Sequence, residues 1–499
     1  MSLMQDYLEH PEDVLGQWLA WRAESAAALV VMTATEGGAV RERGALMAVA
    51  GDGRAAGYIS GGCIDADVIL QAQTALKTGE TMQLRYGAGS PFVDLPLPCG
   101  GAIEVSILPD ANETSLRACH DALAARRPAR LRLPGAGVDA RYVPKLKIRI
   151  AGRGADPLAL ARLAKASGIE TVLHLRDGED VAAARAAGFD EAGALETPSD
   201  LPVMTDDPWT AFILMFHDSD WEGPLLQQAL EGPAFYVGAV GSRRTHARRC
   251  EALRLAGVSD AEIARIHGPV GLIASMRDAS MLAVSTLAEI VADYHETARA
   301  PFARTALVML AAGGSTRFTE GDKLLARYKG EPVLAHAARL LADEALAARV
   351  AITRPGAPER DAVLEAAGWE TIENPAASSG QASSLMAALG SVSARGDIDQ
   401  VIILLADMPD IPENHLRKLQ RLTAAGADAA MSEAAGKLLP PAIFTRSTFA
   451  ALMQVEGDRG AKGVFEALDN TASAPLAPAA AFDIDTIQDL KSAEEALHA

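Results

Sequence analysis

Short apolar runs alternate along the chain with glycine-rich turns and with segments of helical periodicity. Residues 13–22 have the spacing of a helix, and the apolar run 26–34 is typical of a buried strand. A region dense in glycine follows, and its short apolar runs predict strands joined by tight turns. Within it, residues 64–79 predict a helix that ends on Gly79. The first part of the chain therefore predicts a glycine-rich α/β domain over residues 1–110.

The pattern then changes to strand, glycine turn, helix and strand over residues 146–175, which is a βαβ unit. Further apolar strands and an amphipathic helix extend this unit to a Rossmann-like α/β domain over residues 145–297. Residues 111–144 predict a helix and then a connection. The same alternation resumes at Thr305 and predicts a third, Rossmann-like α/β domain with a mostly parallel sheet over residues 304–499.

The composition narrows the range of partners. The 499 residues include 46 Lys or Arg and 65 Asp or Glu, a formal net charge of −19. Such a field repels phosphate backbones and anionic lipid, which argues against nucleic acid and membrane surfaces. The first residues lack a signal peptide pattern, and no apolar run reaches the length of a membrane span. The four cysteines form no CxxC pair, so reduced thiols in the cytoplasm are expected.

The strand that opens the third domain runs into LAAGGSTRF, residues 310–318. Glycines at a strand-to-helix turn let backbone N–H groups approach phosphate oxygens, and the helix N-terminus adds a favourable dipole. Ser315 offers a hydroxyl, and two cations follow, Arg317 and Lys323. A turn with surface cations is the alternative interpretation, but two cations after a glycine pair favour a phosphate site.

Acidic residues in this domain predict a metal site. Asp407 follows an apolar strand, at the carboxyl end where α/β sheets place ligands, and a carboxylate there is suited to Mg²⁺. Asp483 and Asp485 precede a helix, so we expect one to be a second metal ligand, with Asp485 favoured, and the other to cap the helix. The domain shows no clear general base, which fits a reaction whose nucleophile is already an anion.

Residues from about 305 to 499 resemble the MobA-like nucleotidyltransferases, in particular the molybdenum cofactor cytidylyltransferases. The resemblance rests on LAAGGSTRF…DKLL, GEPVLAHAARLL, NPAASSGQASSL, LLADMPDI, GDRGAK and DIDTIQDL, in that order. It implies transfer of CMP from CTP to the terminal phosphate of molybdopterin, with Mg²⁺ and release of pyrophosphate. Ala312 favours CTP over GTP, because LAAG and not LAGG accompanies CTP in the family. RFTEGDK carries one residue more than the family pattern before Lys323.

The resemblance also implies roles for individual residues. The catalytic residues implied are Arg317, Lys323 and Asp407, and the metal ligands are Asp407 and Asp485. The nucleotide-binding residues implied are Leu310, Ala311, Ala312, Gly313, Gly314, Ser315, Gln381 and Ser384.

Two cysteines of the first domain lie beside paired glycines, Cys63 in GGCIDADV and Cys99 in LPCGGAIEV. A thiol next to exposed amides fits a reactive or metal-facing thiolate. A small hydrophobe packed at a tight turn is the alternative, and the residues alone favour it.

Residues 15–108 and 145–295 resemble the two halves of the XdhC/CoxI accessory proteins of molybdenum hydroxylases. The first half is similar through GALMAVAGDGRAAGYISGGCIDADV and LPCGGAIEVSIL, and the second through FHDSD, YVGAVGSRRTHARR, IARIHGPVGL and LAVSTLAEIVADY. The resemblance implies binding of the molybdenum cofactor, its protection while a terminal sulfur is installed, and its delivery to a hydroxylase. The cofactor-binding residues implied are Gly61, Gly62, Cys63, Cys99, Gly100 and Gly101.

The glycine turn of the middle domain argues against NAD, because AGRGADP has Pro157 where a dinucleotide loop needs glycine. In GSRRTHARR, Gly241 and Ser242 open a helix that is either an anion site or a solvated basic face.

Two classes of function follow. The chain is either an enzyme fused to the carrier of its product or a molybdenum cofactor chaperone whose transferase domain is silent. A transferase that uses GTP and a sugar-nucleotide transferase that acts on a sugar phosphate are further alternatives. The expected partner is a molybdenum hydroxylase apoenzyme, with a cysteine desulfurase and a second copy of the chain, as a homodimer, as further candidates.

Overall fold

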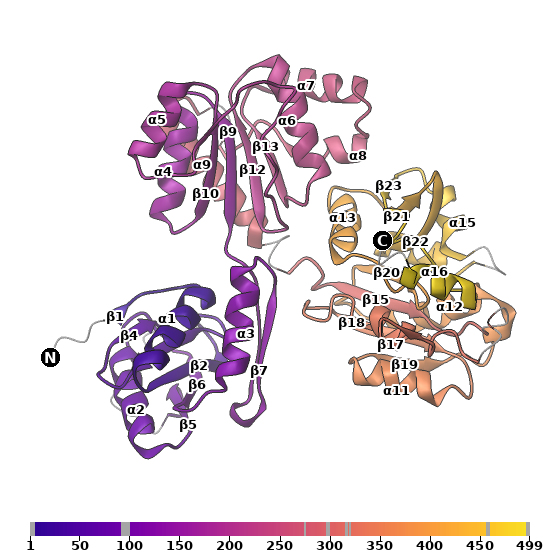
Figure 1. Ribbon diagram of the computed structural model, residues 1–499, viewed down its shortest axis with the longest axis horizontal. Coiled ribbons are helices and arrows are strands. Elements are labelled where there is room, and N and C mark those ends of the chain that lie inside the picture. The colour runs from indigo at the N-terminus through magenta and orange to yellow at the C-terminus, as the bar shows by residue number, and fades with distance from the viewer. Residues whose placement is uncertain are drawn as a thin grey trace. The chain divides into compact units, whose positions relative to one another are not determined.

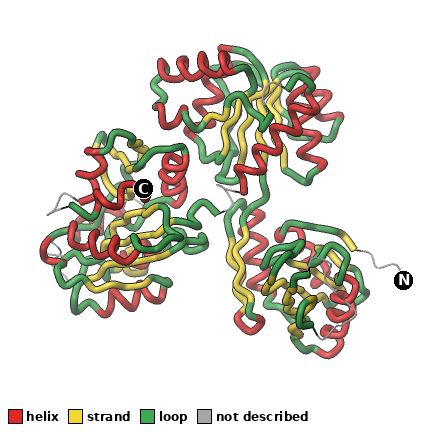
Figure 2. The backbone as a smooth tube through the Cα atoms, turned by 180° about the vertical axis from the view of Figure 1, so that it is seen from behind, coloured by secondary structure: helices red, strands yellow, loops and turns green. Residues whose placement is uncertain are grey.

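The computed structural model describes residues 5–90, 100–273, 276–295, 300–314, 318, 321–455 and 460–495. The chain divides into two compact units, Met1–Lys145 and Leu146–Ala499. The first unit contains a six-stranded sheet, and the second contains a six-stranded and a seven-stranded sheet (Figure 1). Each of these sheets carries helices, as the colouring by secondary structure shows (Figure 2). Within the described ranges, no helix has both the length and the apolar character needed to cross a membrane.

The sheet of the first unit has the strand order β1-β4-β3-β2-β6-β5. Its strands are β1 (Gln5–Asp6), β2 (Ala27–Glu36), β3 (Leu46–Ala50), β4 (Ala55–Gly57), β5 (Met82–Gly87) and β6 (Ala102–Leu108). The remaining elements are α1 (Pro11–Glu24), α2 (Asp65–Thr78), α3 (Glu113–Ala124) and the hairpin of β7 (Ala129–Leu133) and β8 (Val138–Tyr142). The predicted helix end is confirmed, since α2 is followed by Gly79 at φ +74°.

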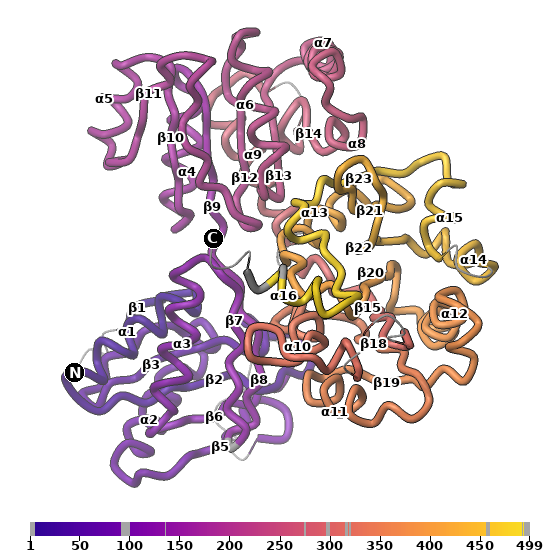
Figure 3. Tube along the Cα trace, turned by 45° about the vertical axis from the view of Figure 1, so that its right-hand side comes forward, coloured from indigo at the N-terminus to yellow at the C-terminus, as the bar shows by residue number. Residues whose placement is uncertain are grey.

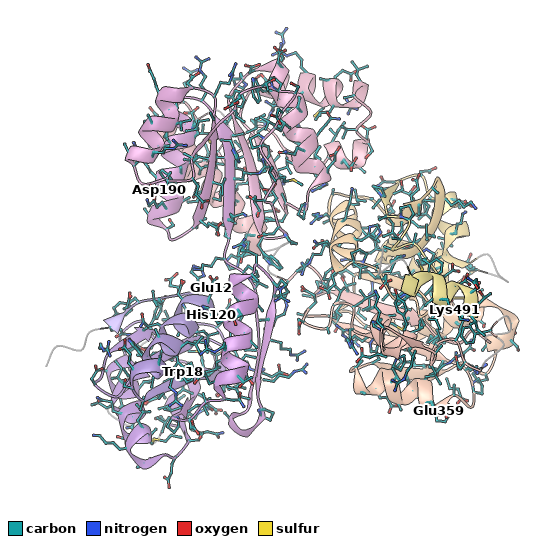
Figure 4. The ribbon with its side chains drawn as sticks, viewed as in Figure 1. Glu12, Trp18, His120, Asp190, Glu359 and Lys491 are labelled. Carbon is teal, nitrogen blue, oxygen red and sulfur yellow. The ribbon has the colours of Figure 1, made fainter. Side chains whose placement is uncertain are left out.

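Alternate residues of β2 face two hydrophobic cores. Leu29 and Val31 pack in a core with α1, α3 and the β7–β8 hairpin. Val30 and Met32 pack in a second core with α2 on the opposite face. Trp18 of α1 is fully buried in the first of these cores (Figure 4). Both faces of the sheet are therefore covered, which explains the near-continuous apolar run along β2.

The segment 111–144 differs from the expectation of a helix followed by a connection. After the predicted helix α3, the chain forms the β7–β8 hairpin. Leu131 and Leu133 of β7 are buried, while Arg130 and Arg132 between them are exposed. This alternation of apolar and polar side chains is that of a strand with one face on a core.

The second unit begins with a parallel sheet of order β11-β10-β9-β12-β13-β14. Its strands are β9 (Lys147–Gly152), β10 (Glu170–Leu175), β11 (Gly193–Ala194), β12 (Thr210–Met215), β13 (Tyr236–Ala239) and β14 (Ile266–His267). Its helices are α4 (Ala155–Ala166), α5 (Gly178–Ala186), α6 (Ser219–Glu231), α7 (Arg243–Leu255), α8 (Asp260–Ile263) and α9 (Ala279–Asp293). The strand order reverses between β9 and β12, as in doubly wound folds, so the Rossmann-like prediction is confirmed.

The third sheet has the order β19-β18-β15-β20-β22-β21-β23. Its strands are β15 (Thr305–Leu310), β18 (Ala348–Thr353), β19 (Glu370–Glu373), β20 (Gln400–Leu405), β21 (Ala429–Ala434), β22 (Lys437–Thr445) and β23 (Thr471–Pro475), and a separate hairpin joins β16 (Arg327–Tyr328) to β17 (Glu331–Pro332). Its helices are α10 (Val333–Ala338), α11 (Pro358–Ala366), α12 (Gln381–Val392), α13 (Glu413–Ala424), α14 (Phe449–Leu452), α15 (Gly460–Ala467) and α16 (Ile487–Glu495). Only β22 runs antiparallel to its neighbours in this sheet, which confirms the mostly parallel prediction.

The two faces of the third sheet carry different helices. Leu307 and Met309 of β15 pack in one core with α10, α11 and α13. Ala306 and Val308 pack in the other core with α12, α14 and α15 (Figure 3). Both faces are covered, and folds of this kind place ligands at the carboxyl ends of the parallel strands.

Candidate active site

Three residues from distant parts of the chain meet at the carboxyl edge of the third sheet. β15 and β20 pair in register through their last residues, so the loop after β15 and Asp407 after β20 leave the sheet side by side. The Nζ atom of Lys323 donates hydrogen bonds to Oδ2 of Asp407 at 2.6 Å and to Oδ1 of Asp485 at 2.7 Å. The extra residue before Lys323 therefore does not remove its ammonium group from the two predicted carboxylates.

The cluster is mostly withdrawn from solvent, since 11% of the Lys323 side chain and 19% of the Asp407 side chain are exposed. Burial alone would lower the pKa of Lys323, but the charges and hydrogen bonds of Asp407 and Asp485 outweigh burial and raise it. Oδ1 of Asp407 is buried and has no hydrogen-bond partner within the described part of the chain. A buried carboxylate oxygen without a donor indicates a position for a further ligand.

A buried ion pair joins the two ends of the loop that carries the glycine pair, residues 311–323. The carboxylate of Asp322 accepts hydrogen bonds from Nε and Nη2 of Arg360 at 2.7 and 2.8 Å. Arg360 lies fully buried on α11 and also donates to the carbonyl oxygen of Ala311. Burial would raise the pKa of Asp322, but Arg360 holds it below its usual range. Arg360 therefore fixes the residue that begins the loop relative to the residue before Lys323.

No local pattern in the sequence predicts this pair. Asp322 stands beside Lys323 in the GDK segment, but its partner Arg360 is 38 residues further along the chain. A lone arginine at the start of a helix carries no local signal of such a contact. The strand order, which places β18 and the helix after it beside β15, brings the two together.

The predicted nucleotide-binding residues lie around this loop. Leu310 ends β15, Ala311 and Ala312 are buried, and Gly313 and Gly314 follow them. A Cβ atom added at Gly313 would meet no atom of the described residues within 4 Å, so among these residues the backbone is open to an approaching group there. Two further predicted residues, Ser315 and Arg317, lie outside the described residues.

The motif NPAASSGQASSL and Gly460, the second glycine of GDRGAK, meet at the start of α12. Gln381 is the first residue of α12, and a Cβ atom at Gly460 would lie 2.8 Å from its Oε1 atom. Gly460 has φ +55°, so glycine is favoured there on both grounds. Ser384, one turn into α12, is buried and accepts a hydrogen bond from Nδ2 of Asn374 at 3.1 Å.

The expectation that Asp483 or Asp485 caps the following helix is wrong. Thr486 Oγ1 accepts the N–H of Asp489 at 3.2 Å, and Asp489 Oδ2 accepts the N–H of Thr486 at 2.7 Å. This reciprocal pair caps α16, because Thr486 directly precedes its first residue, Ile487. Oδ1 of Asp485 accepts a hydrogen bond from Lys323.

Carboxylates are the available metal ligands at this edge. Burial, together with the charges of Asp407 and Asp485, raises the pKa of Asp483, so negative charge is concentrated here. No group of three or more His, Cys, Asp or Glu side chains arranged to hold a metal ion occurs in the described ranges. A divalent cation at this edge would therefore need ligand oxygens from a substrate or water in addition to those of the protein.

In the first unit, Asp65 organises the loop that carries Cys63. Its carboxylate accepts the N–H groups of Ser60 at 2.9 Å and Gly62 at 2.6 Å. Gly61 and Gly62 have φ +70° and +115°, which favour glycine. Cys63 itself is exposed, so it is not the buried hydrophobe of the alternative interpretation. Asp65 had no assigned role in the sequence analysis.

The loop of residues 37–44 lies against both predicted cofactor segments. A Cβ atom at Gly61 would lie 3.6 Å from Cγ1 of Val40, and one at Gly101 would lie 2.5 Å from the carbonyl oxygen of Gly38. The segment before Cys63 and the segment with the second glycine pair therefore flank one loop. Cys99 lies outside the described residues.

Three stretches of the sequence match known families. Residues 20–87 match the XdhC and CoxI family, residues 148–290 the XdhC Rossmann domain, and residues 307–472 the MobA-like NTP transferase domain. The molybdenum cofactor insertion chaperone PaoD of Escherichia coli (strain K12) is 35% identical over 282 residues, which are 53% of this chain and 82% of that protein. The chain belongs to the XdhC and CoxI family. In addition, it carries a MobA-like NTP transferase domain.

The matched stretches of this XdhC and CoxI family member contain most of the described site residues. The first stretch includes Cys63 and Asp65, and the third includes Lys323 and Asp407. The third stretch ends at residue 472, before Asp485, which only the fold brings to the lysine.

Two solved structures are similar to parts of this XdhC and CoxI family member. A xanthine dehydrogenase from Bacillus halodurans has a TM-score of 0.48 and 21% identity, and the match covers 58% of this chain and 96% of that one. Rv0371c from Mycobacterium tuberculosis H37Rv has a TM-score of 0.34 and 21% identity, covering 38% and 98% of the two chains.

Proposed function

We propose that this chain transfers CMP from CTP to the terminal phosphate of molybdopterin and holds the product for insertion into a molybdenum hydroxylase. One observation carries the proposal. Lys323, Asp407 and Asp485 meet at the carboxyl edge of a sheet in a MobA-like NTP transferase domain, beside a loop with paired glycines. An acidic chain of net charge −19 offers phosphates few other positions.

The reaction needs charge neutralisation and positioning more than proton transfer. An oxygen of the phosphate monoester forms a bond to the α-phosphorus of CTP, and the bond from that phosphorus to pyrophosphate breaks. The attacking oxygen is already anionic, so no general base is required. The raised pKa of Lys323 keeps its ammonium group charged at neutral pH. Its partly buried position strengthens its interaction with the negative charge that builds on the leaving group.

A divalent cation fits the residues present. Oδ1 of Asp407 is buried without a donor in the described part of the chain, and carboxylate oxygens are the ligands that Mg²⁺ prefers. Asp407 and Asp485 would hold the ion. When bound, Mg²⁺ supplies a Lewis acid that neutralises charge on the nucleotide phosphates. The ion pair of Asp322 and Arg360 keeps the loop that presents Lys323 in place.

Ala312 supports CTP as the nucleotide. Its side chain is buried in the core shared with α12, immediately before Gly313. A methyl group fixed at that position limits the space beside the loop, and glycine would leave the space open. The choice between CTP and GTP would then rest on the shape of the base pocket.

The carrier function is supported by the other half of the chain. Its relative PaoD is named a molybdenum cofactor insertion chaperone, and that match spans 82% of PaoD. In this chain the first unit presents the exposed thiol of Cys63 on a loop fixed by Asp65. We infer that this loop contacts the cofactor and that a molybdenum hydroxylase apoenzyme receives it.

One assay separates the competing functions. Purified protein and Mg²⁺ are given molybdopterin with CTP, molybdopterin with GTP or, as a control, a sugar phosphate with CTP. Pyrophosphate release is measured in each mixture. Release with CTP and molybdopterin supports the proposal. Release only with the sugar phosphate would assign a sugar-nucleotide transferase. Retention of the cofactor without any release would assign a chaperone with a silent transferase domain.

A further inference from the structure

A cavity of about 450 Å³ opens at the carboxyl edge of the Rossmann sheet. It is lined entirely by residues of that domain, and it lies where β9 and β12 end, the point at which the strand order reverses. Doubly wound folds bind ligands at this switch point. The volume falls within the range of small-molecule pockets. The proposed transferase reaction uses none of these residues.

Seven of the twelve lining residues are apolar, Pro269 among them. Met215 and Phe216 come from the end of β12, Val240 follows β13, Val270 follows β14, and Met276 and Leu282 come from the segment around the start of α9. Phe216, Val240 and Val270 are themselves almost fully buried, so their positions are fixed by packing. Such a lining stabilises a flat ring system by burial of apolar area.

The polar lining carries charges of both signs. Arg153 and His217 can donate to phosphate oxygens, and α4, α6 and α7 all begin at this edge, so their N-termini add favourable dipoles. Asp156 and Asp218 can accept from ring amino groups or hydroxyls, and Asp218 also accepts the N–H of Asp220 at 3.1 Å. A ligand with a phosphate at one end and hydrogen-bond donors at the other satisfies both sets.

The wall formed by the loop after β14 is held rigidly. The Glu289 carboxylate accepts the N–H of Gly271 and lies 3.1 Å from Nδ1 of His267. These contacts fix both ends of the segment that contributes Pro269 and Val270 to the cavity. The pocket is therefore formed before a ligand arrives, which lowers the entropic cost of binding.

On the side of the switch point toward β10, where a dinucleotide would place its second half, protein groups pair with one another. The N–H of Gly154, which would face a pyrophosphate, donates instead to Oδ2 of Asp180 at 2.7 Å. Nε of Arg153 is paired with Asp177, which follows β10, at 2.6 Å. The cavity accordingly extends over β12, β13 and β14 and not over β10 and β11. A dinucleotide needs both sides of the switch point, whereas a ligand of half that size needs one.

We propose that this pocket binds the phosphate ester of a heteroaromatic ring compound no larger than a mononucleotide. Mononucleotides and pterin phosphates share this chemistry. The inference is independent of the transferase proposal, because the residues of the two sites do not overlap.

Methionine methyl groups report on this pocket in the full chain. The chain is labelled with ¹³C-methyl methionine. Met215 and Met276 lie in the cavity, whereas Met408 follows the transferase strand β20 and Met281 is exposed on α9. The probes are CMP, 6-hydroxymethylpterin phosphate, nicotinamide mononucleotide and NAD⁺. We expect CMP or the pterin phosphate to shift the Met215 and Met276 signals but not that of Met281, and the tighter ligand identifies the source. Shifts confined to Met408 would overturn the proposal.

Two comparisons test the recognition itself. Arg153→Ala should weaken binding at Met215 about tenfold, because a charged hydrogen bond to phosphate is lost. Arg162→Ala, an exposed arginine of helix α4 outside the cavity, should leave the affinity unchanged. Equal affinities of the Arg153→Ala variant and the wild type would refute the phosphate contact. Tighter binding of NAD⁺ than of nicotinamide mononucleotide would refute the size limit.

Discussion

The Nζ atom of Lys323 lies 2.6 Å from Oδ2 of Asp407, although 84 residues separate them in the sequence. One comes from the glycine loop after β15 and the other from the end of β20. Their pairing places a cation and a carboxylate at one edge of the sheet.

Asp407→Asn should abolish CMP transfer. The change keeps the shape of the side chain but removes its charge, so it weakens metal binding through Oδ1 and the contact with Lys323 together. We expect kcat to fall by at least about a hundredfold, since a charge acting on the transition state contributes about 3 kcal/mol. Pyrophosphate release at saturating Mg²⁺ measures it. Asp397→Asn, at an exposed pair with Arg395, is the matched control and should retain full activity. A near-normal rate for Asp407→Asn would refute the assignment.

Lys323→Ala should lower kcat about a hundredfold and raise the KM for CTP much less. The reason is that its charge interacts mainly with negative charge that develops during the transfer. Steady-state kinetics at several CTP concentrations separate the two constants. Lys437→Ala, at an exposed position on β22, serves as the control. Unaltered turnover in Lys323→Ala would show that this lysine does not act in the reaction.

Ala312→Gly should reduce the preference for CTP over GTP without a large loss of rate. Removing one methyl group changes the shape of the base pocket and leaves the charged cluster intact. A contact of this size changes discrimination by about tenfold. The ratio of kcat/KM for the two nucleotides, measured in wild type and variant, gives the result. A wild type that prefers GTP would contradict the proposed cytidylyl transfer.

The ion pair of Asp322 and Arg360 should stabilise the loop in a pH-dependent way. Arg360→Ala removes the buried guanidinium that donates to both oxygens of Asp322 and to the Ala311 carbonyl, at a cost of about 3–5 kcal/mol. Because the folded pKa of Asp322 is depressed, its stabilisation is present above the unfolded pKa of about 3.9. It is lost as the pH falls through the folded value.

Hydrogen exchange of the β15 and α11 amides measures this effect. The difference in protection between wild type and Asp322→Asn should be constant near neutral pH and should shrink below about pH 4. Asp361→Asn, at the acidic neighbour of Arg360 on α11, is the control. The same dependence of the protection difference on pH in this variant would contradict a specific role of the Asp322–Arg360 pair.

Cys63→Ser should weaken retention of the molybdenum cofactor and leave CMP transfer unchanged. The thiol is exposed on a loop held by Asp65, in a unit separate from the transferase domain. Cofactor that remains bound after gel filtration is the measurement. Cys250→Ser, a partly buried thiol of α7, is the control. Equal retention in wild type and Cys63→Ser would remove Cys63 from the cofactor site.

Local patterns in the sequence predicted the order of the elements and the strand ends and turns at which candidate site residues lie. Apolar runs followed by glycine and helical spacing act over a few residues, so they located β15, β20 and α2, and they placed Asp407 at a strand end and Cys63 beside its glycines. The contacts of Lys323 with Asp485, 162 residues apart, and of Asp322 with Arg360 arise from the folded chain and could not be predicted from local patterns. The same is true of the cap of α16 by Thr486 and Asp489 and of the contact between Gly154 and Asp180 at the switch point of the Rossmann sheet. Such contacts depend on strand order and on the path of each loop. Local periodicity does not encode which distant side chains the strands and loops bring within hydrogen-bonding distance.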